Sequence, residues 1–104
     1  MIKNLSQLKK KLVRGIEFKI TEHRRAECIG QVRMVNVADT TGFYSIVPAE
    51  PYNRINISNG SRGSFLGWSK AAFWEFGDGG ICRLYSSDKE RSAEYLILGI
   101  QVLN

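Results

Sequence analysis

The spacing of apolar residues changes once along this chain, at Gly15, and that change limits the folds available to it. Before Gly15, Leu5, Leu8 and Leu12 repeat at i, i+3 and i+7, which predicts a short helix over residues 4–15. Asn4 is a suitable N-cap, and Gly15 is placed to end the helix. Because so short a helix is unstable alone in water, its leucine stripe must pack on another element.

After Gly15, apolar and polar residues alternate, as is typical of half-buried β-strands. The pattern predicts strands over 16–21, 29–37, 43–47 and 96–102, a hairpin of 73–76 with 81–85, and strand-like character over 65–68. A change of phase within 29–37 indicates a β-bulge. The chain of 104 residues therefore predicts a single α+β domain over 1–104. We expect a short N-terminal helix packed on a mostly antiparallel, twisted sheet or half-barrel of about six strands.

Positive charge is concentrated in the first third of the chain. The whole sequence carries a net charge of +5, with 15 Lys and Arg residues against 10 Asp and Glu. Residues 1–35 hold nine basic and three acidic residues, so this segment alone carries +6. Such asymmetry suits an anionic partner, although a solvated basic face would look the same. The residues predicted to bind nucleic acid or a nucleoprotein partner are Lys9, Lys10, Lys11, Arg14, Arg24 and Arg25. Arg33 belongs to the same basic set that could hold phosphates.

The segment 48–64 is the longest stretch dominated by turn-forming and small polar residues. Loops of this length within a small domain are often functional. Arg54 and Arg62 in this segment are therefore predicted as secondary contact residues. Tyr44, Tyr52 and Trp68 are the aromatic residues on which a nucleobase could stack.

Neither cysteine belongs to a metal-binding motif. Cys28 and Cys82 lack a nearby CxxC or HxxxH pair, so two buried, inert thiols are expected instead of a zinc site. We predict no metal and no cofactor. No secretory segment and no apolar stretch long enough to cross a membrane is present, so we expect a cytoplasmic protein without a membrane partner.

Two alternatives to a binding function remain open. A small metal-independent ribonuclease could use His23, the only histidine, with Arg24, Arg25 and Tyr44 or Tyr85. A homo-oligomeric structural protein could instead pair through an exposed strand over residues 96–103.

Three segments together carry a resemblance: LSQLKKKLVRG, IGQVRMVNVADTTGFYSIV and SFLGWSKAAFWEFGDGGICRLYSS. In their order of helix, hairpin and aromatic-glycine turns they resemble small accessory proteins of bacteriophages and conjugative elements of Gram-positive bacteria. The resemblance implies a binding role, which in some such proteins is inhibition of a host defence nuclease, as in anti-CRISPR proteins. A basic chain differs from acidic inhibitors that mimic DNA, so acidic protein surface, guide RNA or a target strand would be the expected contact. The leading hypothesis is a non-enzymatic accessory protein that binds a nucleic-acid-handling complex.

Overall fold

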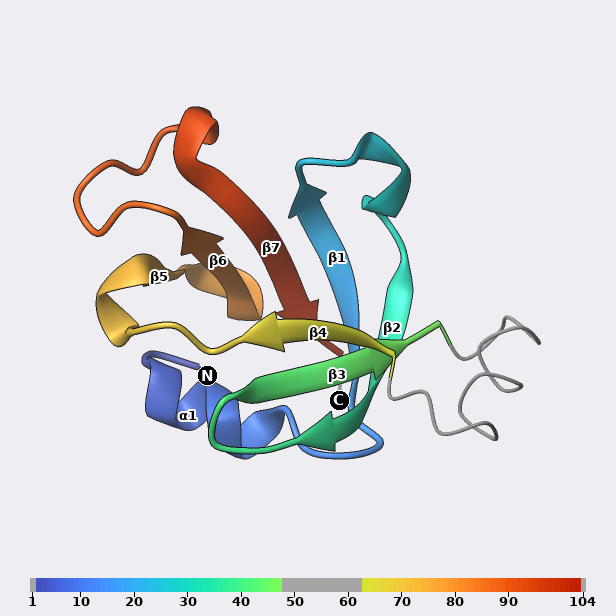
Figure 1. Cartoon of the computed structure of the whole chain (residues 1–104). Coiled ribbons are helices and arrows are strands. Elements are labelled where there is room, and N and C mark those ends of the chain that lie inside the picture. Colours follow the sequence, from blue (N-terminus) through green and yellow to red (C-terminus); the bar gives the residue numbers. More distant parts are fainter. Residues whose placement is uncertain (1, 48–62, 104) are drawn as a thin grey trace.

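The described part of the chain, residues 2–47 and 63–103 of a computed structural model, contains one α-helix and seven strands (Figure 1). Short 3₁₀ turns connect several of them. In chain order the elements are α1 (Leu5–Lys11), β1 (Glu17–His23), η1 (Ala26–Cys28), β2 (Val32–Ala38), β3 (Gly42–Ile46), β4 (Ser64–Gly67), η2 (Ala71–Phe73), β5 (Trp74–Phe76), η3 (Asp78–Gly80), β6 (Ile81–Tyr85), η4 (Ala93–Tyr95) and β7 (Leu96–Val102).

All seven strands form one antiparallel sheet in the order β4-β3-β2-β1-β7-β6-β5, and the sheet is not closed. Figure 1 shows it curving so that β3 and β4 face the β1–β7 part across the interior. The predicted α+β class and antiparallel pairing are confirmed, whereas the count of six strands was wrong. The edge strands β4 and β5 have only four and three residues, too few to establish a period of two.

Helix α1 begins as predicted but ends early. The Asn4 side chain accepts a hydrogen bond of 2.9 Å from the Gln7 N–H, which confirms the N-cap. The last helical residue is Lys11, and Leu12 is the C-cap. The chain then turns toward β1, and the Gly15 N–H donates to the Val35 carbonyl at 2.9 Å. This contact with β2 requires the helix to stop before Arg14, which the leucine spacing alone could not show.

The core lies between α1 and the concave face of the sheet. Leu8 and Leu12 are fully buried there, so the leucine stripe packs as predicted. The Phe43 ring contacts Phe18 and Trp68, with centroids 5.8 Å and 5.0 Å away. The Trp68 Nε1–H donates to the Asp39 carbonyl at 2.7 Å, which satisfies its buried polar atom. This aromatic cluster joins β1, β3 and the segment after β4.

Two strands on the concave side differ from their predicted bounds. The register between β2 and β3 shifts between Val35 and Val37, which confirms a bulge in this segment. The strand itself starts at Val32, because η1 and the turn at Gly30 occupy the residues before it. Strand β1 extends to His23 and has a second register shift, against β7, between Ile20 and Glu22. The pattern of apolar residues did not predict this second shift.

Strand β7 cannot serve as the exposed edge proposed for self-association. It lies between β1 and β6 and pairs with both, so its backbone groups are already used. The long apolar alternation of 96–102 indicated a strand, but strand order depends on pairing between distant segments. The edges of the described sheet are β4 and β5. No helix among the described residues is long and apolar enough to cross a membrane.

Candidate functional site

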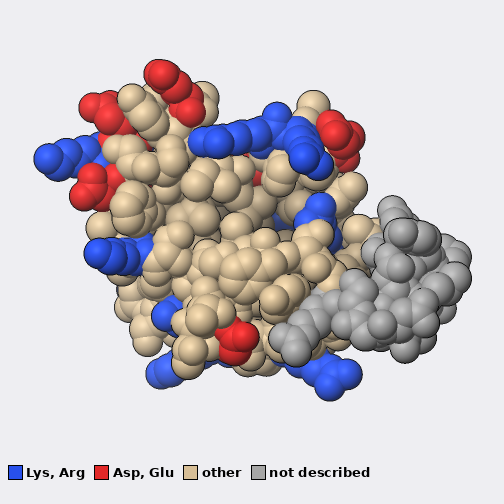
Figure 2. All heavy atoms as spheres, viewed as in Figure 1, with Lys and Arg blue, Asp and Glu red and all other residues tan. Residues whose placement is uncertain are grey.

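The basic residues singled out from the sequence divide into two groups at opposite ends of the molecule. Lys9, Lys10 and Lys11 form the last turn of α1, and Arg14 follows in the turn to β1. Arg24 and Arg25 directly follow β1, whose C-terminal end lies far from α1, at the top of Figure 1. Figure 2 accordingly shows Lys and Arg at the top and at the lower edges, without one continuous basic patch on this face. Arg54 and Arg62, with most of the 48–64 segment and Tyr52, lie outside the described residues.

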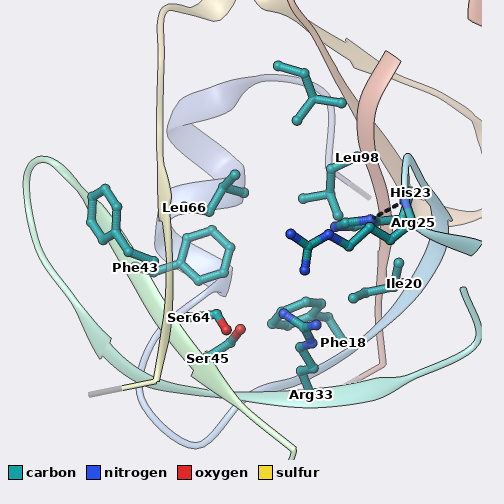
Figure 3. A pocket seen from close by; sticks show the side chains of 12 residues that line it. Phe18, Ile20, His23, Arg25, Arg33, Phe43, Ser45, Ser64, Leu66 and Leu98 are labelled. Carbon is teal, nitrogen blue, oxygen red and sulfur yellow. Dashed lines mark hydrogen bonds between the residues drawn. The ribbon is translucent and has the colours of Figure 1, made fainter. Parts of the chain in front are cut away.

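Arg24 and Arg25 are adjacent in sequence but have different roles. The Arg24 Nε–H donates to the Leu96 carbonyl at 3.1 Å and so fastens the end of β1 to the start of β7. Arg25 extends into a pocket, as Figure 3 shows. Only the second arginine is therefore placed to meet a ligand in that pocket.

The pocket has a volume of about 210 Å³. Its residues come from β1, β2, β3, β4 and β7, together with the turn after β1. They are Phe18, Ile20, His23, Arg25, Arg33, Phe43, Ser45, Ser64, Phe65, Leu66, Ile97 and Leu98 (Figure 3). None of them is acidic.

The floor of the pocket is the apolar core itself. Phe18, Ile20 and Phe43 are almost completely buried and face the concave side, as alternate residues of a strand must. Ser45 and Ser64 are cross-strand partners on β3 and β4 and add hydroxyl groups to one wall (Figure 3). The interior is thus largely apolar, with a few polar groups in fixed positions.

Two arginines and a histidine surround the mouth. Arg33 is the cross-strand partner of Phe18, and its side chain lines the pocket (Figure 3). Its Nη2–H and Nε–H both donate to Gln31 Oε1, at 2.9 Å and 3.2 Å. Within the described residues, ion pairs join Arg83 to Glu22 and Glu75, and neither Arg25 nor Arg33 has a carboxylate partner. The mouth therefore carries two arginines that form no ion pair among the described residues, although the charge of Glu27 reaches His23 beside them.

His23 is held by the backbone of Arg25. The Arg25 N–H donates to His23 Nδ1 at 2.9 Å, so Nδ1 is the unprotonated nitrogen and Nε2 carries the hydrogen. Burial, followed by the charges of Arg33 and Arg25, lowers the pKa of His23 from 6.5, while Glu27 acts in the opposite direction. A neutral ring in this tautomer is a hydrogen-bond donor at Nε2, and its one lone pair is already engaged.

The tyrosines considered for acid–base chemistry are elsewhere. Tyr44 and Tyr85 do not line the pocket. Tyr44 packs on Phe65, with ring centroids 4.9 Å apart, and the Arg91 guanidinium lies 5.0 Å from the centroid of the buried Tyr85 ring. Trp68, considered as a stacking platform, is only 3% exposed and belongs to the core, so that expectation was wrong.

Ser45 was not selected from the sequence. Arg33 belongs to the basic set that was expected to hold phosphates, and Ser64 is the last residue of the 48–64 segment that was expected to be a contact loop. The register Phe18↔Arg33 and Ser45↔Ser64 places all three at one opening. No local pattern could reveal this, because the pairing joins separate strands.

The cysteines are buried, as predicted. Both thiols are free, and burial raises the pKa of Cys82 to about 11. Cys28 Sγ accepts a weak hydrogen bond from Arg33 Nη2 at 3.8 Å. Across residues 2–47 and 63–103, no three His, Cys, Asp or Glu side chains are grouped to hold a metal ion.

No family model, no curated protein and no solved structure matches this chain.

Proposed function

We propose that the protein is a non-enzymatic binding protein that contacts single-stranded nucleic acid within a nucleic-acid-handling complex. One observation carries the proposal: Arg25 and Arg33 both line one pocket, and none of its lining residues in the described part of the chain is acidic. Guanidinium groups bind phosphate oxygens through paired N–H donors, and nucleic acid offers regularly spaced phosphates. The His23 Nε2–H adds a further donor beside them.

The chemistry of His23 supports binding over cleavage. Metal-independent cleavage of RNA needs a base that removes the proton from the 2′-hydroxyl group and an acid that protonates the leaving group. The His23 lone pair is engaged by the Arg25 N–H, and among the described residues no tyrosine or carboxylate lines the pocket. We therefore favour a binding protein over the alternative ribonuclease.

The biological setting rests on the resemblance described above. We place the protein among accessory proteins of mobile elements, acting in the cytoplasm on a host complex such as a defence nuclease. An arginine-lined pocket suits contact with guide RNA or an exposed strand better than mimicry of DNA, since a mimic must present negative charge.

The test is a binding titration with a fluorescently labelled short single strand, DNA or RNA, at low and moderate salt. Wild-type protein should bind, and Arg25→Gln with Arg33→Gln should lose about tenfold or more, as expected for two charge-assisted contacts. Lys10→Gln with Lys11→Gln is the matched control, because it removes the same charge from the far end of the molecule and should bind nearly normally.

Two results would contradict the proposal. Equal binding by the arginine variant, with an unchanged thermal midpoint, would remove the pocket from the interface. Cleavage of the labelled RNA by wild-type protein, but not by His23→Asn, would establish the ribonuclease instead.

A further inference from the structure

The pocket is too small for a whole ligand of ordinary size. Its volume of about 210 Å³ is below the roughly 300–1,000 Å³ of sites that enclose a drug-sized molecule or cofactor. It also ends on the buried side chains of Phe18, Ile20 and Phe43. A continuous phosphodiester backbone cannot enter such a dead end, so only a group that projects from the chain can occupy it.

The polar and the apolar lining residues lie in different parts of the pocket, and this determines which part of the inserted group can enter it. The arginines lie at the mouth, and the interior is formed by Phe18, Ile20, Phe43, Leu66 and Leu98 (Figure 3). A phosphate at the floor of the pocket would lose its hydrating water and would find no hydrogen-bond donors in exchange. This transfer would be unfavourable in free energy. The ligand must therefore carry its negative charge outside and insert a part with little charge.

The walls favour a flat group with a polar edge. Arg33 and its cross-strand partner Phe18 both line the pocket, and nucleobases stack on guanidinium planes as well as on aromatic rings. The Ser45 and Ser64 hydroxyls on the opposite wall can each donate and accept a hydrogen bond. A nucleobase has flat faces that can stack on the wall with Arg33, and its edge carries donors and acceptors for the two serine hydroxyls.

We propose that the pocket accepts one unstacked nucleobase of a single strand, with its flanking phosphates held by Arg25 and Arg33. This inference rests on the proposed function and specifies how the strand is held. It requires an unpaired base, so a duplex without mismatches or ends should bind much more weakly than a single strand. A free peptide C-terminus with an apolar side chain is the competing occupant, but it carries only one negative charge for two arginines.

The experiment compares a short oligothymidylate with a strand of equal length and charge in which every nucleotide is abasic. If a base occupies the pocket, the abasic strand should bind about tenfold or more weakly, since stacking of one base contributes that much. Ser64→Phe should fill the opening from the exposed edge strand β4 and reduce the affinity for oligothymidylate to that of the abasic strand. Ala38→Phe is the control, because it adds the same ring at an exposed residue of β2 that does not line the pocket.

Each outcome separates this inference from the proposed function. Equal binding of both strands, lost in the Arg25→Gln and Arg33→Gln variant, would overturn base insertion and leave phosphate binding intact. Binding of neither strand would overturn both. Binding of a short peptide with an apolar C-terminal residue, abolished by amidation of its carboxylate, would assign the pocket to peptide ends and also overturn the inference.

Discussion

The His23 side chain shows how one hydrogen bond restricts the chemistry of a residue. Its Nδ1 accepts from the Arg25 backbone, and the positive charges of Arg25 and Arg33 oppose its protonation. Protonation would replace this acceptor with a donor and place a third cation at the mouth. Burial is the largest cause of the lowered pKa of His23, and the charges of Arg33 and Arg25 add to it.

We predict that folding stability depends on His23 in mildly acidic solution. Because the pKa of His23 is lower in the folded protein than the ordinary 6.5, the unfolded chain binds the proton first as the pH falls. The free energy of unfolding should decrease as the pH drops below about 6.5, until the folded pKa is passed. His23→Asn keeps an acceptor near the Nδ1 position but does not titrate, so its profile should be flatter between about pH 7 and pH 5. Urea unfolding at several pH values measures this, and parallel profiles would contradict it.

At the scale of elements, Gly99 allows a row of charges to cross four strands. Arg83 on β6 is paired with Glu75 on β5 and with Gly99 on β7, and Gly99 is paired with Glu22 on β1. The Arg83 Nε–H donates to Glu22 Oε1 across the glycine, while Arg83 Nη1 lies 3.6 Å from Glu75 Oε1. The hydrogen bond to Glu22 is the main reason that the pKa of Arg83 is raised. The ion pair between Arg83 and Glu22 can therefore span β7, because Gly99 has no side chain between them.

We predict that Gly99→Ala destabilises the protein by about 1–3 kcal/mol, the usual cost of overpacking. The new Cβ would lie 2.8 Å from Thr21 Oγ1 and 2.9 Å from Glu22 Oε1, closer than side chains tolerate. Without such contacts, replacing glycine would raise stability slightly, because it restricts the unfolded chain. Arg83→Gln should cost only about 0–1 kcal/mol, since the pair is partly exposed. Chemical denaturation compares the two variants, and Gly99→Ala as stable as wild type would refute the argument.

At the scale of the whole molecule, the two groups of cations lie at opposite ends of the sheet, and only one borders the pocket. A short strand held at the pocket should release the counterions of about two phosphates, and the lysines of α1 should take no part. The basic residues of the first third thus lie on two separate parts of the molecule.

We predict a shallow salt dependence for binding of a short single strand. Two neutralised phosphates give a slope of about −1.4 in a plot of log affinity against log salt, because each contributes about −0.7. Arg25→Gln or Arg33→Gln should each reduce the slope by about 0.7, whereas Lys9→Gln, Lys10→Gln and Lys11→Gln together should not change it. Titrations at several salt concentrations measure the slopes. An equal reduction in the lysine variant would show that the strand contacts α1 as well.

Most of the local structure could be predicted from the sequence. The helix with its Asn4 cap, the hairpin of β5 and β6, the bulge in β2 and the buried cysteines all follow from spacing and residue type. The early end of α1 and the order of the strands, with β4 and β5 at the two edges, could not, because contacts with distant residues determine them.

The candidate site was predicted only in part. Arg25 and His23 were identified for their chemistry, and both line the pocket. Lys9 and Arg14 have the same local signal as Arg25 and Arg33 but lie at the other end of the molecule, while Ser45 had none.

The sequence by itself determined which residues form the helix, which form strands and which faces are apolar, because these properties depend on neighbours a few positions away. Only the tertiary structure decided which strands pair and in what register. That pairing placed Arg33 beside Phe18 and Ser45 beside Ser64, and it put β7 in the middle of the sheet. The pocket exists because residues from five strands meet there, and such a meeting leaves no pattern along the chain.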